Sequence, residues 1–237
     1  MTAMRALVLT GGIAHPFEET APALAAILAS EGIEADVTDD VEAGLARLAD
    51  RELLVVQCLR WSMVQHEKYA PHRDRWALSL SDAGKGAIAA HLARGRGILG
   101  IHAAPISFDA FEAWGELLGA RWVWGRSGHP PIGTIRARAV GEADAITRGI
   151  GPFALVDELY GDLELAPDAR VLVEATADGE AWQPVLVVAD RPGRRAAYVA
   201  FGHDMRAFAV PEVRTLIGRA ARFAAGLDLH SREKGTA

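Results

Sequence analysis

The chain has 237 residues, a mass of 25.3 kDa and 50% hydrophobic residues, which fits one domain with a substantial core. Its net charge of -6 and pI near 5.8, without clustered basic residues, argue against nucleic acid as a partner. We expect no membrane partner and a cytoplasmic location, because no apolar run could cross a bilayer and the amino terminus leads directly into a predicted strand. The single cysteine, Cys58, excludes an intramolecular disulfide.

The first half of the chain alternates predicted strands and helices. In order, these are a strand at 5–12, a helix at 21–31, strands at 34–38 and 52–58 with a short helix at 43–49 between them, a helix from Ser81, a strand ending at His102 and a helix at 108–118. This alternation predicts a mostly parallel sheet with helices on both faces. The long connection at 60–80 is polar and aromatic, which is typical of a binding loop or lid.

The second half has a different pattern. Strands are predicted at 121–138, 170–176, 184–189 and 195–201, and a final helix begins at Pro211. Turns such as Asp178-Gly179 and Pro192-Gly193 separate these strands, so we expect an antiparallel extension of the sheet. The whole pattern predicts one α/β domain over residues 1–228, followed by a polar tail at 229–237.

His102 stands where a buried strand breaks into a sharp turn, in the run from Gly97 to Pro105. Ligands of parallel sheets bind past the carboxyl ends of the strands, and in related strand-turn-helix elbows this position carries a Ser or Cys nucleophile. An imidazole there favours acid-base chemistry or metal ligation over acyl transfer. The small neighbours Ala103 and Ala104 leave room for a ligand. The structural alternative is a histidine that fills space and donates to a backbone carbonyl.

Two other segments carry chemically active side chains. His203 follows the strand at 195–201 through Gly202, and the adjacent Asp204 could orient its ring or serve as a second carboxylate. The alternative is an ordinary turn capped by Asp204. Asp157 and Glu158 form an acidic pair that could act as base or ligand, or lie in a solvated turn.

The remaining candidates depend on where folding places them. His15 would lie at the same edge of the sheet as His102 if the sheet is doubly wound. His129 lies in a proline-rich segment for which a surface loop is the favoured interpretation. Trp61 belongs to a group of tryptophans of which one or two could stack on a sugar, the others being core residues. Cys58 is interpreted as a small buried hydrophobe, and the alternative is a nucleophilic thiol.

Several short motifs in order resemble the ThuA-like (trehalose utilisation) family over nearly the whole chain. They are Ser81-Asp82, Gly100-Ile101-His102-Ala103-Ala104, Gly128-His129, Asp157-Glu158-Leu159-Tyr160 and Gly202-His203-Asp204. The resemblance implies a flavodoxin-like three-layer sandwich similar to class I glutamine amidotransferases, with Gly-Ile-His in place of the cysteine elbow. It also implies a bacterial role in the use of trehalose or related disaccharides, often beside oxidoreductases that make keto-sugars.

Together these observations predict a carbohydrate-processing enzyme that is not a glutamine amidotransferase, because its elbow has no thiol. The predicted catalytic residues are His102, His203, Asp157 and Glu158. The predicted substrate-binding residues are His15, Trp61, His129, Tyr160 and Asp204. No cofactor follows with certainty; a divalent metal held by some of the histidines and a carboxylate is an open sub-hypothesis. The alternative is a non-catalytic sugar-binding or regulatory module. The expected partner is a small sugar, and a homo-oligomer is left open.

Overall fold

The structure, a computed structural model, describes residues 4–141 and 144–229. Its core is a nine-stranded sheet in the order β2-β1-β3-β4-β11-β10-β9-β6-β7, and β5 pairs with β8 in a separate small sheet. The strands are β1 (Met4–Gly12), β2 (Ile33–Thr38), β3 (Leu53–Leu59), β4 (Gly97–Ile101), β5 (Ala120–Arg121), β6 (Gly133–Ala139), β7 (Phe153–Asp157), β8 (Glu164–Leu165), β9 (Arg170–Ala177), β10 (Gln183–Arg191) and β11 (Arg194–Val199).

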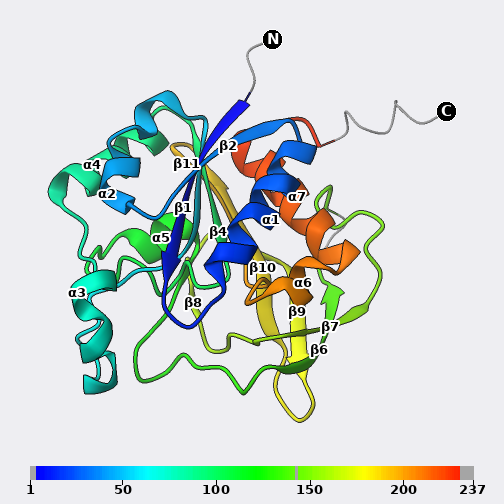
Figure 1. Cartoon of the computed structure of the whole chain (residues 1–237). Coiled ribbons are helices and arrows are strands. Elements are labelled where there is room, and N and C mark those ends of the chain that lie inside the picture. The colour runs from blue at the N-terminus through cyan, green and yellow to red at the C-terminus, as the bar shows by residue number, and fades with distance from the viewer. Residues whose placement is uncertain (1–3, 142–143, 230–237) are drawn as a thin grey trace.

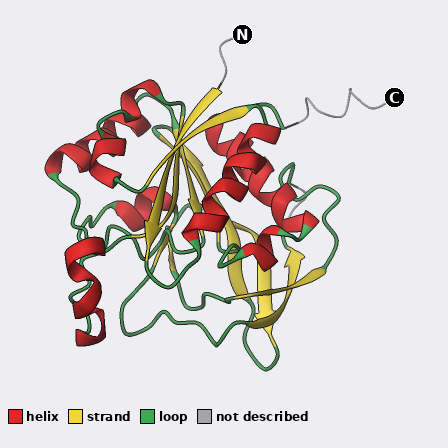
Figure 2. Cartoon of the chain, viewed as in Figure 1, coloured by secondary structure: helices red, strands yellow, loops and turns green. Residues whose placement is uncertain are grey.

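Helices cover both faces of the sheet, which gives three layers (Figures 1 and 2). The helices are α1 (Phe17–Ser30), α2 (Val41–Leu45), α3 (Arg73–Trp76), α4 (Asp82–Ala93), α5 (Trp114–Leu118), α6 (Met205–Phe208) and α7 (Pro211–Ala225), with 3-10 turns η1 (Leu48–Asp50) and η2 (Glu67–His72). In Figure 1, α1, α6 and α7 lie on one side of the sheet, and α2, α4 and α5 lie on the other. The flavodoxin-like three-layer prediction is therefore confirmed.

The central strands are apolar along their whole length because both of their faces are covered. All residues of β3 and β4 are buried, as expected for a parallel sheet packed on both sides. The final helix α7 buries an apolar stripe against this sheet that includes Val213, Leu216 and Ile217.

The strand order brings the segments that follow β1, β4, β7 and β11 to one edge of the sheet. The strands β2, β1, β3, β4 and β11 are parallel, so their carboxyl ends share that edge. Beyond β11, each neighbouring pair is antiparallel through β10, β9, β6 and β7. Four successive reversals return β7 to the direction of β11. The residues after β7 therefore emerge on the same side as those after β1, β4 and β11.

Two predicted elements are wrong. The strand expected at 121–138 is instead the short β5 and the later β6, joined by an irregular segment. The helix expected at 108–118 is reduced to α5: Phe108 has a positive φ of 57°, which excludes a helix start there, and the bonds from Phe111 N–H to Phe108 and from Trp114 N–H to Phe111 are those of successive turns. The carboxylate of the next residue, Asp109, binds the segment after β3. It accepts hydrogen bonds from the N–H and hydroxyl of Ser62 and from the side-chain amide of Gln65. The sequence also gave no indication of β7. Of the tail predicted at 229–237, Leu229 packs against the core, and residues 230–237 lie outside the described residues.

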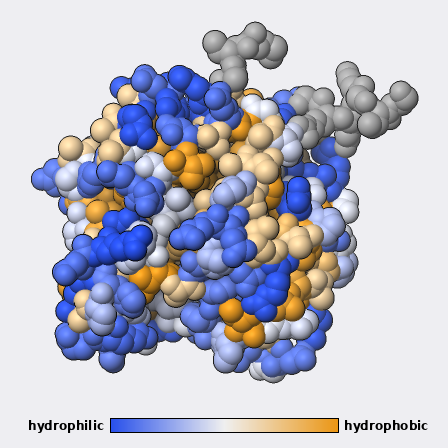
Figure 3. All heavy atoms as spheres, in the orientation of Figure 1, coloured by the Kyte–Doolittle hydropathy of each residue, from blue (hydrophilic) through white to orange (hydrophobic). Residues whose placement is uncertain are grey.

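Among the described residues, no helix combines the length and apolarity that crossing a membrane requires. Figure 3 shows hydrophilic side chains over much of the face in view, with apolar side chains interspersed among them. This distribution is ordinary for the surface of a folded domain.

His91 provides a test of stability against pH. Its side chain is buried in α4, and its Nε2 donates to the carbonyl of Gly97 at 3.0 Å. Burial lowers the pKa of His91 below its ordinary value of 6.5. Below pH 6.5 the imidazole of His91 is protonated in the unfolded chain but stays neutral in the folded chain until a lower pH. The contribution of His91 to the free energy of unfolding is therefore fully present above pH 6.5 and is lost as the pH falls.

We expect the free energy of unfolding to decline from pH 7 to pH 5, and the decline to be shallower in His91→Gln. One proton accounts for a slope of up to about 1.4 kcal/mol per pH unit. Urea unfolding at several pH values measures both slopes. Equal slopes for the two proteins would exclude His91 as a source of the acid sensitivity.

Candidate active site

His102 is held rigidly in a strained backbone conformation directly after β4. Its φ is 47°, in the left-handed region that non-glycine residues rarely adopt. Its N–H donates to the carbonyl of Val199 at 2.8 Å, and its own carbonyl accepts from the Tyr198 hydroxyl at 3.0 Å. Its ring Nδ1 donates to the carbonyl of Ala200 at 2.7 Å, because a carbonyl can only accept. These bonds fix both the turn and the ring, with Nε2 left to face the site.

Glu158 lies at the centre of a histidine cluster formed by the four segments at this edge of the sheet. Its Oε2 is 3.2 Å from Nδ1 of His203, 3.3 Å from Nε2 of His102 and 4.0 Å from Nε2 of His15. These residues follow β7, β11, β4 and β1. We call His15, His102, Glu158 and His203 the histidine–glutamate cluster.

The electrostatics of the cluster follow from its burial and its close contacts. Burial, reinforced by the nearby His102, lowers the pKa of His15 to about 3, so this ring is neutral at pH 7. Burial raises the pKa of Glu158, but the close rings of His102 and His203 outweigh it and hold the pKa well below its usual range. For His203 burial lowers the pKa, and the contact with Glu158 more than reverses this, so its pKa is raised. Glu158 is therefore a carboxylate, and its charge favours the imidazolium form of His203.

Asp157 acts on the backbone rather than on a ligand. Its side chain is 2% exposed and accepts hydrogen bonds from the N–H groups of Gly202 at 2.8 Å, His203 at 3.1 Å and Glu158 at 2.9 Å. Burial raises its pKa, partly offset by nearby His102 and by these N–H groups. Asp157 thus ties the end of β7 to the turn after β11, which positions Glu158 and His203 together.

His129 and Tyr160 form one side of the cluster. The ring of Tyr160 is 2% exposed and its centroid lies 4.6 Å from that of His102. His129 stacks on Tyr160 at 5.5 Å, and its Nδ1 is 3.5 Å from Oε1 of Glu158. The predicted surface loop therefore brings His129 to the site. Its side chain is 38% exposed, so it lies at the outer side of the cluster.

The structure does not place Trp61 and Asp204 as predicted. Trp61 is 2% exposed and is enclosed among Tyr69, Trp124 and other apolar side chains, so its faces are not open to a sugar. Asp204 caps α6 through the N–H of Arg206 and pairs with the guanidinium of the same residue. Its carboxylate is thereby engaged with α6 instead of orienting His203.

A cavity of about 660 Å³ adjoins the cluster and shares His15 with it. Its lining includes Thr10, Asp39 and Trp76, none of which the sequence analysis selected. The Thr10 hydroxyl is buried and has no hydrogen-bond partner among the described residues. Gly11 keeps this space open, because a Cβ there would lie 3.1 Å from Asp39 and 3.2 Å from Trp76. One signal was available: Asp39 directly follows β2 and so had to lie at the ligand-binding edge.

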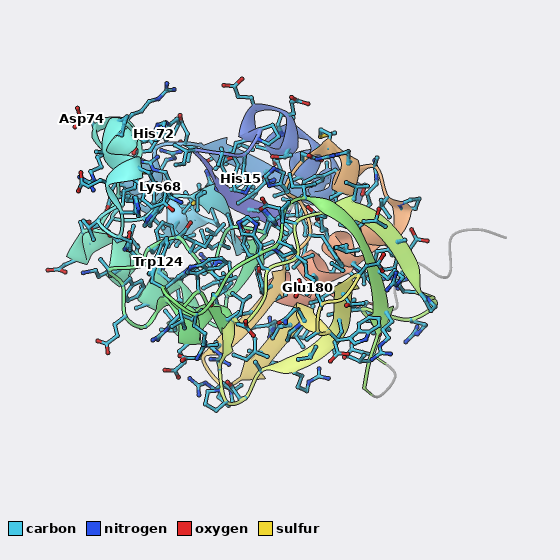
Figure 4. The ribbon with its side chains drawn as sticks, turned by 90° about the horizontal axis from the view of Figure 1, so that it is seen from below. His15, Lys68, His72, Asp74, Trp124 and Glu180 are labelled. Carbon is cyan, nitrogen blue, oxygen red and sulfur yellow. The ribbon has the colours of Figure 1, made fainter. Side chains whose placement is uncertain are left out.

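Of the segment predicted as a binding loop or lid, Arg75 and Trp76 reach this cavity. His72 is exposed and lies at the periphery together with Asp74, whereas His15 lies well inside the outline of the molecule (Figure 4).

Cys58 is expected to be chemically inert. Its side chain is fully buried in β3, with its sulfur 3.6 Å from the Ser107 hydroxyl, and burial raises its pKa to about 11. We expect iodoacetamide to leave the native protein unmodified and to label one site after unfolding in urea, as mass spectrometry would show. Cys58→Ala should keep turnover within about two-fold of the original protein. Rapid labelling of the native protein would contradict the assignment.

The order of the sheet and the elbow at His102 define an α/β protein of the flavodoxin-like class, related in fold to class I glutamine amidotransferases. Within that class the chain belongs to the ThuA family, described as trehalose utilisation, whose profile matches residues 5–224. The predicted resemblance is thereby confirmed. No match was found among curated proteins.

Solved structures show the same fold at low sequence identity. A ThuA-like protein from Parabacteroides merdae has a TM-score of 0.74 and 16% identity, with 95% of this chain and 91% of that chain covered. A cytoplasmic protein from Salmonella typhimurium has a TM-score of 0.63 and 15% identity, with coverages of 96% and 99%. A glutamine amidotransferase from Thermotoga maritima has a TM-score of 0.50 and 15% identity, with coverages of 85% and 76%.

Proposed function

We propose that this protein is a carbohydrate-processing enzyme whose reaction takes place at the histidine–glutamate cluster. The observation that carries this proposal is the convergence of three imidazoles and a carboxylate, from four separate strand ends, beside a cavity. Maintaining a buried carboxylate and unpartnered imidazole nitrogens costs stability, which is typical of a functional site. Membership of a family described as trehalose utilisation supports a sugar as the substrate.

The cluster provides groups for proton transfer in both directions. The raised pKa of His203 favours its imidazolium form, so it can donate a proton to a leaving or carbonyl oxygen. His15 is neutral and its Nε2 makes no hydrogen bond within the described structure, so it can accept one. Glu158 stabilises positive charge on either ring, and Asp157 positions the turn. Glutamine hydrolysis through a cysteine elbow does not fit this arrangement, because His102 occupies the elbow.

The adjoining cavity has the size and chemistry for a sugar. Its volume of about 660 Å³ falls within the range of small-molecule sites, and it offers the indole of Trp76 together with the carboxylate of Asp39. Aromatic faces pack against the C–H faces of sugar rings, while carboxylates accept hydrogen bonds from sugar hydroxyls. We propose that a disaccharide or a keto-glycoside binds here, with its reactive part toward His15.

A non-catalytic sugar-binding or regulatory module is the second candidate. It is favoured by one observation, namely that the elbow carries no nucleophilic side chain although the fold is that of amidotransferases. Such a module would bind the sugar through the same cavity but would leave it chemically unchanged.

The test is turnover of trehalose and of keto-disaccharides derived from it, followed by chromatography of the products. We expect conversion by the unaltered protein, and a rise in KM of about ten-fold in Trp76→Ala, the cost of one lost aromatic contact. His72→Ala, a substitution on the same connection but outside the cavity, should leave KM unchanged. Saturable sugar binding with no conversion of any of these sugars would favour the non-catalytic module.

A further inference from the structure

We propose that His15, His102, Glu158 and His203 bind a divalent transition-metal ion of the zinc type. One ligand atom from each of these residues lies within 4.8 Å of the other three. The inference concerns the same cluster that the proposed function uses, and with the ion bound His15 and His203 would serve as ligands in place of the proton-transfer roles given above. It rests, however, on geometry and donor chemistry and not on the identity of the substrate.

The hydrogen bonds around the rings direct lone pairs into the cluster. Nδ1 of His15 donates to the carbonyl of Ile13 at 3.0 Å, and Nδ1 of His102 donates to that of Ala200 at 2.7 Å. In a neutral ring whose Nδ1 carries the hydrogen, Nε2 carries a lone pair. Backbone carbonyls fix the tautomer of metal-binding histidines in this way.

Those lone pairs face a carboxylate, which is unfavourable unless a positive charge lies between them. Nε2 of His15 and Nε2 of His102 are buried and make no hydrogen bond among the described residues, although Oε2 of Glu158 lies 4.0 Å from the first and 3.3 Å from the second. Burial in a medium of low dielectric makes such an arrangement costly. A cation at the centre, by displacing the proton that Glu158 favours on His203, would satisfy the three ring nitrogens and the carboxylate together.

The dimensions fit such an ion. In a tetrahedral zinc site with bonds of about 2.0–2.1 Å, neighbouring ligand atoms are about 3.3 Å apart. The distances from Oε2 of Glu158 to His203 and His102, at 3.2 and 3.3 Å, match this separation between ligand atoms. The contact with His15, at 4.0 Å, needs to shorten by about 0.7 Å, and the ring nitrogens, which lie within 4.8 Å of one another, need to approach as well. A side-chain adjustment of that size accompanies ligand binding in many proteins.

The donor set selects the class of metal. Three imidazoles and one carboxylate suit zinc and neighbouring transition metals, whereas magnesium and calcium prefer oxygen ligands. A bound ion of this kind acts as a Lewis acid that polarises a carbonyl or hydroxyl oxygen. Within this chain, the two backbone-anchored rings would hold such an ion next to the cavity that includes His15.

The experiment uses the full chain, stripped of metal by a chelator and titrated with zinc chloride by calorimetry. We expect one equivalent of zinc to bind, with an affinity at least about 100-fold lower in His102→Ala and in His15→Ala, because each removes a ligand from a four-ligand site. His72→Ala, which removes an exposed histidine away from the cluster, should bind zinc as the unaltered protein does. Magnesium chloride should not compete.

Cobalt provides a measurement that needs no variant. Cobalt bound at a tetrahedral site with nitrogen and oxygen ligands should give strong visible absorption, which added zinc should abolish. Failure of the unaltered protein to bind zinc, or equal binding by both cluster variants and by His72→Ala, would overturn the proposal. If the protein turned over a sugar but bound no zinc, the metal site would be overturned while the proposed function stayed intact. Stoichiometric zinc binding without turnover of any sugar would support the metal site and contradict the proposed function.

Discussion

Glu158→Gln is expected to lower kcat/KM for the sugar by about 10³-fold, which corresponds to about 4 kcal/mol of lost transition-state stabilisation. Glu158 is the one residue of the cluster that lies close to all three imidazoles. Glutamine has nearly the same size but no charge, so it cannot stabilise an imidazolium or compensate a cation. Steady-state kinetics on the best substrate measures this effect.

Glu180→Gln is the matched control, because it makes the same chemical change at an exposed position. Glu180 lies in the turn between β9 and β10. Its substitution should leave kcat/KM unaltered. Thermal unfolding of both variants separates loss of catalysis from loss of structure. If Glu158→Gln kept the original kcat/KM, the cluster would not be the site of the reaction.

Three of the four positions of the cluster could be predicted from the sequence. His102, His203 and His15 each follow an apolar strand that ends in or near glycine, and parallel strands present their carboxyl ends together. Local patterns therefore sufficed to place them at one edge. The tautomers of His15 and His102 could not be predicted, because they depend on hydrogen bonds to carbonyls whose positions the fold determines.

Glu158 could be selected as a candidate but not placed at the centre. Its position depends on β7, a strand of five residues with only partial burial, whose direction results from four successive antiparallel pairings. Long-range pairing of this kind has no local signature. The same limitation explains His129, which looked like a surface residue until β7 brought Glu158 and Tyr160 beside it.

The wrong predictions have a common physical origin in side-chain packing. Trp61 has the chemistry of a sugar-stacking residue, but it is enclosed by Tyr69 and Trp124. Trp76, from the same connection, reaches the cavity instead. Which of two tryptophans remains accessible is decided by tertiary contacts and not by residue type.

Asp157→Ala should be among the most destabilising single substitutions in this chain, with a loss of about 3–5 kcal/mol in the free energy of unfolding. The substitution leaves the N–H groups of Glu158, Gly202 and His203 without their acceptor, and each unsatisfied buried group costs about 1–3 kcal/mol. Part of this cost is offset, because burial of the carboxylate is itself unfavourable, as its raised pKa indicates. Urea unfolding monitored by circular dichroism measures the difference.

Asp178→Ala is the matched control at an exposed position, and we expect it to lower the free energy of unfolding far less than Asp157→Ala. Asp178 is 88% exposed, directly follows β9 and pairs with Arg136 in the neighbouring strand β6. An exposed ion pair contributes about 0–1 kcal/mol, because water solvates both charges once the pair is broken. Asp157→Asn should fall between the two, since its amide keeps one acceptor oxygen but turns an NH2 group toward a backbone N–H. Equal stability of Asp157→Ala and Asp178→Ala would mean that the turn at Gly202 and His203 is held by other contacts.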